Sequence, residues 1–512
     1  MTEAVEETVQ TSPTRKLRYT WVVICACLVN TIVGSGIVKD SVKWAAFGGS
    51  WAFVGVFALW LVTFLVSISM SENASIIKEN GGVYIWAKRS LGRFWGIQVG
   101  GVYLVAYSSL SVIMLWLTSS YTMAFIGPVL PVSQSTLEFI QGVIVPLIFV
   151  IFFAIIYSTG KKLTTQTLIG FFTIKTTMWF ILMGIGLIHG GQSSEFVKDD
   201  LDLAPALMNV ATSAVWAMLG LDTCSVITGD IHKPGKNMPK GVVAGMIIVL
   251  VLYLTSILMV LTLAGQSGAE GFVQLGEDFS GIGDVLLSFL SIPPVVVKVF
   301  IVISISGTTF ITFYIVIRIA GAMRENNDFF RWRRMKYLKR RQKKKVERKR
   351  IRDPEIKDMP RGVMLFFSFI YIGANYLIFY EGRRYGTGAV FYMIYYTAIL
   401  ATILVLMLTC LTNIFLHKRG IAKEIKAEKG DFRLKKGTWA IFSIAGIFLS
   451  ILVIFLIVSE MFADPDNLLP QDATQSYAWK FWGIFARVYP VSMVLPGILI
   501  WALKAKRTVP EI

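Results

Sequence analysis

The feature that most constrains this chain is an apolar run that is interrupted before it completes a membrane crossing. Residues 20–47 read TWVVICACLVNTIVGSGIVKDSVKWAAF, and their first half is uncharged and long enough to span a bilayer. Gly34-Ser35-Gly36, followed by Lys39 and Asp40, interrupts the run. Backbone groups freed by such a break cannot face lipid, so the break persists only where it lines a cavity enclosed by protein.

The two ends of a helix break have opposite chemical character. The N-terminal end of the second half offers free N–H groups and a partial positive charge, which suit a carboxylate. The C-terminal end of the first half offers carbonyl groups, which suit an ammonium group or another cation. The stretch therefore predicts a site for a zwitterion, although glycines at this spacing also occur where helices merely pack closely.

The composition of the whole chain is that of a polytopic membrane protein. Of its 512 residues, 55% are apolar and 16% are charged. The apolar runs predict about twelve spans of roughly twenty residues each. These spans are expected near residues 20–45, 51–71, 96–126, 139–158, 167–189, 206–229, 241–264, 294–323, 362–380, 388–416, 438–459 and 479–503. Residues 1–18 are polar and carry no cleavable signal pattern.

The net charge of +18 is distributed in a way that indicates a membrane orientation rather than nucleic-acid binding. Lys and Arg gather in alternate loops, and the loops between them are neutral or acidic, with Arg383 and Arg384 as the exception. The basic groups lie at residues 15–18, 88–93, 161–162, 233–240, 331–352, 418–436 and 504–507. The pattern predicts that these loops and both termini lie in the cytoplasm, with the protein in the plasma membrane. The dense run 331–352 is expected to be a charged connector, with binding of anionic lipid or RNA as the alternative.

The cysteines and histidines give no sign of a disulfide framework or of a catalytic centre. The four cysteines lie in apolar spans, and the three histidines are far apart at span ends. They are Cys25, Cys27, Cys224, Cys410, His189, His232 and His417. We therefore expect no metal site, no cofactor and no enzymatic activity.

The fifth span carries a lysine, Lys175, deep inside the predicted bilayer. A charge at that depth costs about 2.5–3.5 kcal/mol on insertion scales, so it must face a polar interior and find partners. Two roles remain open: a cation that fixes neighbouring helices together, or a coupling group that releases a proton during a transport cycle.

The sixth span is interrupted like the first. Gly220 and Asp222 fall in its middle, and Trp216 lies one turn before Gly220. Breaks in the first and sixth spans occupy corresponding positions in consecutive blocks of five spans. That layout is typical of secondary transporters with inverted repeats, which place the substrate between the two breaks.

Four motifs in chain order carry a resemblance to a known family. Gly34-Ser35-Gly36-Ile37 resembles the first-helix motif of the amino acid–polyamine–organocation superfamily, and the segment 81–92 resembles its loop after the second helix. WAMLGLD with the following HKPGKNMPKG resembles its sixth helix and turn, and IRIAGAMRE resembles the end of its eighth helix. Over residues 20 to about 415 the resemblance implies an all-α, LeuT-like fold. Such a fold has twelve transmembrane helices in a five-plus-five inverted repeat with helices 1 and 6 broken, and it works by alternating access.

The resemblance also implies roles for single residues. It assigns binding of the substrate carboxylate to Ser35 and Gly36, beside Gly34. It assigns binding of the ammonium group to the carbonyls of Ile32, Trp216 and Leu219, beside Gly220, and it makes Trp216 an aromatic gate. Asp222 and Lys175 would couple transport to a driving ion. Lys175 would take the place of a bound sodium ion. The chain departs from the family pattern at Val38, Lys39 and Asp40, and at Gly235-Lys236-Asn237.

The chain is thus expected to divide into two repeats with short additions. The expected parts are a tail (1–18), a first repeat (19–190), a second repeat (206–416) with a basic loop (324–361), two accessory helices (438–503) and a tail (504–512). The predicted function is sodium-independent amino acid transport, by proton symport or exchange, in a lipid membrane and in an oligomeric state left open. The alternatives are exchange of an amino acid for its decarboxylated amine or a polyamine, and a sensor that binds amino acids without moving them.

Overall fold

A computed structural model describes most of the predicted spans. The described residues are 19–190, 207, 210, 214–265, 281–282, 285–287, 293–328, 361–385, 389–425, 427, 431–435, 437–463 and 498. Within them the chain is helical, and the one extended pairing is a bridge between Tyr19 and Ile231. The structure confirms the all-α class.

Nine helices of the described residues are long and apolar enough to cross a membrane, and one bent pair makes a tenth. They match ten of the predicted spans. The span 479–503, apart from residue 498, lies outside the described residues, as does most of residues 206–213. The membrane-crossing helices are α3 (Trp51–Ile76), α5 (Arg93–Ile126), α6 to α7 (Gln134–Thr159), α8 (Lys161–Gly190), α10 (Pro234–Gly265), α13 (Pro294–Glu325), α15 (Arg361–Tyr385), α16 (Ala389–Lys418) and α18 (Thr438–Ala463).

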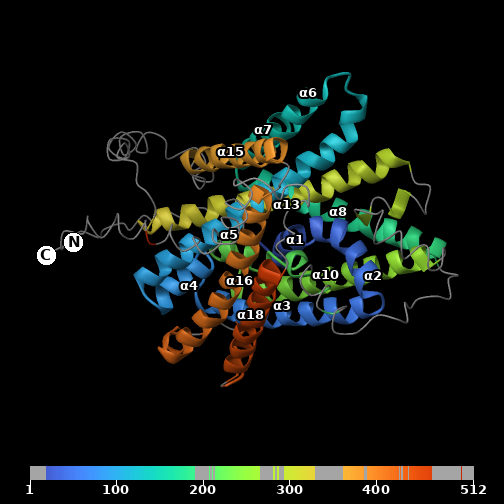
Figure 1. Cartoon of the computed structure of the whole chain (residues 1–512). Helices are drawn as coiled ribbons and strands as arrows, with labels where there is room; N and C mark the ends of the chain where they lie inside the picture. The colour runs from blue at the N-terminus through green and yellow to red at the C-terminus, as the bar shows by residue number, and fades with distance from the viewer. Residues whose placement is uncertain are drawn as a thin grey trace, which may run out of the picture.

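The helix α1 (Trp21–Ile32) lies at the centre of the molecule, as Figure 1 shows. It packs against α8, α10 and α13. Its residues from Val23 to Ile32 are all buried. A helix covered on all sides needs no polar face, which accounts for its nearly continuous apolar sequence.

The first predicted break is confirmed. The helix α1 stops at Ile32, the chain resumes as a π-helical turn (Gly36–Asp40), and α2 (Ser41–Gly48) continues from it. The two halves are bent by 49° relative to each other. Single π-helical turns often mark functional positions in helices.

The second predicted break is also confirmed. Residues 214–217 are helical, residues 218–220 form a turn, and a 3-10 segment, η4 (Leu221–Asp230), follows. Gly220 has φ +105°, a backbone conformation that side chains with a Cβ rarely adopt. Glycine at this position therefore allows the chain to change direction inside the protein.

The short helix α4 (Val83–Ser90) lies in the segment that resembles the family's loop after the second helix, and most of its residues are buried. Val83, Tyr84, Ile85 and Trp86 are buried. Gly82 permits this close docking, because a Cβ there would lie 2.3 Å from the Ser225 hydroxyl of η4. The helix thus packs directly against the second broken span.

The motif at 233–239 is mostly helical, although its prolines and glycine indicate a turn. The helix α10 starts at Pro234, where a missing N–H costs nothing, and contains Pro239. Pro239 cannot donate to the carbonyl of Gly235, and that carbonyl instead accepts a hydrogen bond of 2.9 Å from the backbone N–H of Phe432. The segment 431–435 therefore compensates for the proline.

Candidate functional site

The two helix breaks touch each other in the interior. A Cβ added to Gly36 would lie 2.6 Å from the Cβ of Ala217, and one added to Gly220 would lie 2.2 Å from Cγ2 of Thr31. Each break therefore uses a glycine where the other broken helix approaches. The contact could not form with a larger residue at either position.

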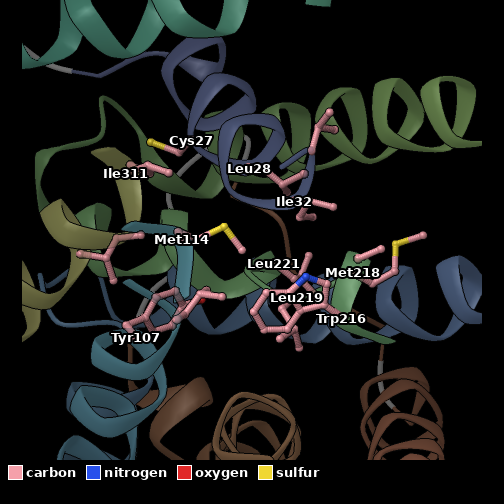
Figure 2. Packing of buried hydrophobic residues seen from close by; sticks show 14 of the residues in the cluster. Cys27, Leu28, Ile32, Tyr107, Met114, Trp216, Met218, Leu219, Leu221 and Ile311 are labelled. Carbon is pink, nitrogen blue, oxygen red and sulfur yellow. The ribbon is translucent and has the colours of Figure 1, made fainter. Parts of the chain in front are cut away.

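Ser35 and Trp216 meet at this contact. The indole Nε1 of Trp216 donates a hydrogen bond of 2.9 Å to the Ser35 hydroxyl, and that hydroxyl lies 3.9 Å from the sulfur of Met114. The Trp216 ring packs on Tyr395 of α16 with ring centroids 4.6 Å apart. Figure 2 shows Trp216 and Leu219 close to Ile32 at the end of α1, with Met114 on α5 nearby. Both Ser35 and Trp216 are buried, so the contact is closed to solvent.

Lys175 finds the polar partners that its position in α8 requires. Its ammonium group donates to the carbonyls of Val33 at 2.6 Å and Asn30 at 3.2 Å, and to the Thr308 hydroxyl of α13 at 3.2 Å. These carbonyls belong to the last turn of α1, where the break leaves them without helical partners. The lysine is completely buried. A single positive charge thus stabilises the negative end of the first half-helix.

Tyr253 of α10 is a site residue that sequence reasoning missed. Its hydroxyl lies 2.8 Å from the carbonyl oxygen of Ile32 and 2.7 Å from that of Ala217, so it bridges the two breaks. Its ring packs edge-on against Trp44 of α2 at 5.5 Å. The bridging role cannot be predicted from the sequence, because a single tyrosine in an apolar span is common.

Asp222 lies just after the second break and faces α5. The Tyr107 hydroxyl donates a hydrogen bond of 2.7 Å to its Oδ1, and the Tyr103 hydroxyl donates one of 3.2 Å to its backbone carbonyl. Its Oδ2 is buried and has no hydrogen-bond partner among the described residues. The two tyrosines were also missed from the sequence.

The structure brings the predicted binding residues together in two groups. Gly34, Ser35 and Gly36 lie at the first break, and Trp216, Leu219 and Gly220 at the second. Two of the carbonyls that the resemblance assigns to an ammonium group already have partners here: Ile32 accepts from Tyr253, and Trp216 accepts from the Leu219 N–H at 3.3 Å. A ligand ammonium would share or displace these bonds.

The described residues contain no group of three or more His, Cys, Asp or Glu side chains placed to hold a metal ion. Cys25, Cys27, Cys224 and Cys410 are free and buried, as their apolar surroundings in the sequence indicate. The polar groups that the described residues offer at the breaks are backbone dipoles, hydroxyl groups and the ionisable side chains of Asp40, Lys175 and Asp222.

A sequence profile of amino acid permeases matches residues 18–499. The chain belongs to the amino acid permease family. This permease is a member of the amino acid–polyamine–organocation superfamily, whose characterised relatives below are transporters rather than enzymes. It is a multi-pass membrane protein.

Three relatives show the range of proteins that the permease resembles. It is 26% identical over 293 residues to a serine/threonine exchanger of Bacillus subtilis, covering 55% of this chain and 62% of the relative. It is 24% identical over 291 residues to a methylthioribose transporter of Bacillus subtilis, covering 51% of this chain and 62% of the relative. It is 23% identical over 257 residues to a polyamine transporter of Arabidopsis thaliana, covering 49% of each chain. The permease thus matches less than two thirds of the length of each of these relatives.

Proposed function

We propose that this permease is a secondary active transporter that moves amino acids across a membrane by alternating access. The observation that carries the proposal is the direct contact of the two helix breaks at Gly36 and Gly220 inside the protein. Half-helix ends that meet in this way present N–H groups to a carboxylate and carbonyl groups to an ammonium. Ser35 and Gly36 would bind the carboxylate of the substrate.

The ammonium group would bind on the opposite side, near the carbonyls of Ile32, Trp216 and Leu219. The Trp216 ring would close over the substrate, since it already bonds Ser35 and packs on Tyr395. The indole N–H donates to the oxygen of the Ser35 hydroxyl, whose own hydrogen points toward the sulfur of Met114. A substrate carboxylate would accept that hydrogen in place of the sulfur, and the Trp216 bond to Ser35 can persist.

The proposal includes independence from sodium. The ammonium of Lys175 sits among the carbonyls of Asn30 and Val33 and the Thr308 hydroxyl, a set of oxygen atoms suited to a cation. The lysine ammonium there would take the place of a bound metal ion. We propose Lys175 and Asp222 as coupling groups, because each is a buried ionisable side chain directly beside a break.

A second mode of transport is exchange of an amino acid for its decarboxylated amine or a polyamine. Its support is that one relative is a serine/threonine exchanger and another a polyamine transporter. Counterflow separates the two modes. An exchanger reconstituted in liposomes takes up label only when the liposomes contain unlabelled substrate, whereas a proton symporter also works without it.

We also propose that the end of the molecule bearing Lys88, Lys161 and Arg318, called the basic end below, faces the cytoplasm of a cell with the protein in its plasma membrane. The support is the charge pattern, since basic residues favour the cytoplasmic side of a membrane protein. Tags placed at the two termini and tested for access in intact and permeabilised cells would establish the orientation.

The decisive experiment is uptake of labelled amino acids by the purified permease in liposomes, with and without a proton gradient and with and without sodium. We expect uptake that needs no sodium and that rises with an inward proton gradient. Lys175→Gln should remove the response to the gradient, and a mutant with unchanged pH dependence would remove Lys175 from the coupling. Binding of amino acids without any flux would instead identify a sensor.

A further inference from the structure

Asp40 is a buried acid beside the first break that the functions proposed above leave unused. It ends the π-helical turn that begins at Gly36, and it is 8% exposed. Its Oδ2 is buried and has no hydrogen-bond partner among the described residues. An ionised carboxylate in such surroundings is costly unless a charge or a proton compensates it.

The position of this oxygen is set by the contact between the breaks. A Cβ on Gly36 would lie 3.5 Å from Asp40 Oδ2 and 2.6 Å from the Cβ of Ala217. Because a carbon–carbon single bond is about 1.5 Å long, the Asp40 oxygen lies within about 5 Å of the Gly36 Cα. It is therefore a neighbour of the backbone N–H groups at the start of the second half-helix.

Asp40 also lies on the side of the break that faces α10. Trp44, one helical turn later and on the same face, packs against the ring of Tyr253. The hydroxyl of Tyr253 is the group that bridges the carbonyls of Ile32 and Ala217. Asp40 thus lies between the first break and α10, on the same side as Tyr253.

A carboxylate of a bound amino acid at Gly36 would place a second negative charge close to Asp40. Two carboxylates that close in surroundings of low dielectric constant do not both stay ionised, and the pair takes up one proton. We propose that Asp40 binds a proton whenever a substrate carboxylate occupies the first break, so that amino acid and proton are bound together. This inference rests on the proposed function, and it adds an obligatory proton to the binding step itself.

The charged and titratable groups around Asp40 are consistent with a proton that comes and goes. Burial disfavours the ionised carboxylate of Asp40, whereas the charges of Lys43 and Lys39 on its own segment favour it. Tyr253 faces it from α10, and Ala217, which faces Gly36 from the second break, is uncharged. A substrate carboxylate would act in the same direction as burial and would shift Asp40 toward its protonated form. The proton is taken from the solution on the side where the substrate enters and is returned when the substrate leaves.

The test is to count protons on binding with the purified permease in detergent. L-serine, L-leucine and L-arginine are titrated by calorimetry in buffers of different ionisation enthalpy, between about pH 5 and pH 8. The amines ethanolamine, isoamylamine and agmatine serve as analogues that lack the carboxylate. The wild type should take up about one proton per amino acid bound, and its affinity should weaken by up to about tenfold per pH unit. An amine that binds should take up none.

Three variants make the test specific. Asp40→Asn, which resembles the protonated acid, should bind amino acids with no proton uptake and with an affinity that does not change with pH. Asp40→Glu should restore the proton uptake, and Glu138→Gln, on the helix α6 away from the breaks, should behave like the wild type. Melting temperatures of all variants establish that they are folded.

Each result has a definite meaning. Proton uptake that is unchanged in Asp40→Asn, or absent in a wild type that binds amino acids, overturns the role of Asp40 and leaves the proposed transport function standing. A wild type that binds none of the amino acids contradicts the proposed function and, with it, the shared proton.

Discussion

At the scale of single residues, two buried side chains fasten the broken helices in different ways. Lys175 binds the end of the first half-helix from α8, and the Tyr253 hydroxyl bridges the carbonyls of Ile32 and Ala217 from α10. A carbonyl in the protein interior costs free energy if it has no donor. These side chains therefore lower the free-energy cost of the breaks, and the backbone N–H and carbonyl groups that they do not bind stay available for a ligand.

Replacing Tyr253 by phenylalanine tests this account of the hydroxyl. The substitution keeps the ring that packs on Trp44 and removes the donor shared by the two carbonyls. We expect a loss of about 1–3 kcal/mol in stability. The measurement is the melting temperature of the purified protein, together with liposome uptake, which should fall. Tyr376→Phe is the matched control, since Tyr376 on α15 is exposed, and an equal effect of both substitutions would contradict the bridging role.

The sequence could predict the breaks but not the residues that satisfy them. Gly34, Gly36 and Gly220 interrupt apolar runs, and this local pattern was sufficient to predict both helix breaks. Lys175 could be predicted to need polar partners, because a charge in a span always does. Tyr253 could not be predicted, since it lies 221 residues from Ile32 and meets it only after folding.

At the scale of elements, the glycine at the second break sets the path of the chain. Gly220 combines a positive φ of +105° with a close approach to Thr31, which leaves no room for a Cβ. The burial of α4 against η4 likewise depends on a glycine, Gly82, which has no Cβ to clash with Ser225. The sequence of α4 does not predict its burial, because a mixture of aromatic and basic residues does not distinguish a membrane surface from a protein neighbour.

Gly220→Ala should therefore be strongly disruptive. The backbone strain at positive φ is about 1–2 kcal/mol, and the clash with Thr31 adds an overpacking cost of about 1–3 kcal/mol. We expect a lower melting temperature and loss of amino acid binding. Gly184→Ala in α8 is the control, since no atom lies within 4 Å of its added Cβ and alanine favours a helix. Normal binding by Gly220→Ala would show that the break tolerates a different path.

The docking of α4 onto the end of α13 supplies a prediction of pH dependence. Asp328, just after α13, accepts hydrogen bonds from Lys88 at 2.6 Å, Tyr84 at 2.7 Å and Arg93 at 3.0 Å. Burial raises the pKa of Asp328, but the hydrogen bonds from Lys88 and Tyr84 outweigh it and leave the pKa below its ordinary value. A carboxyl with a lowered pKa stabilises the fold above its ordinary pKa, and this stability is lost as the pH falls through the folded value.

Asp328→Asn should lower the melting temperature at neutral pH, by an amount that corresponds to about 1–3 kcal/mol because Arg93 is partly hydrated. The difference from the wild type should stay constant down to about pH 4 and shrink below it. Glu79→Gln is the control, because its ion pair with Arg89 at 2.7 Å is exposed on both sides. A difference that does not change with pH would contradict the assigned ionisation.

At the scale of the whole molecule, contacts among the described residues cover the breaks from two directions. Trp216 covers Ser35 on one side. At the basic end, Asp230 after the second break is paired with Lys161 at 3.1 Å and with Arg318, and its carbonyl accepts the N–H of Tyr19 at 3.0 Å. Burial raises the pKa of Asp230, but Arg318 and Lys161 more than offset it, so the carboxyl is ionised at neutral pH. These contacts join the starts of α1 and α8 and the end of α13 to η4.

Opening toward the basic end should therefore depend on Asp230, and native cysteines can report it. Cys27 of α1 lines a small cavity of about 10 Å³ together with Tyr19, and Cys224 lies in η4. In Asp230→Asn the two ion pairs are lost, so Cys27 and Cys224 should react faster with a membrane-permeant maleimide, as followed by mass spectrometry of each peptide.

Two controls separate gate opening from general loosening. Cys410, buried in α16, should react at the same rate in the wild type and in Asp230→Asn. Asp431→Asn removes an ion pair of 2.9 Å with Lys78 that does not involve the broken helices, so it should leave Cys27 and Cys224 protected. A substrate that favours the closed state should slow the labelling in Asp230→Asn. Equal labelling of Cys27 and Cys224 in the wild type and Asp230→Asn would mean that other contacts hold the basic end closed.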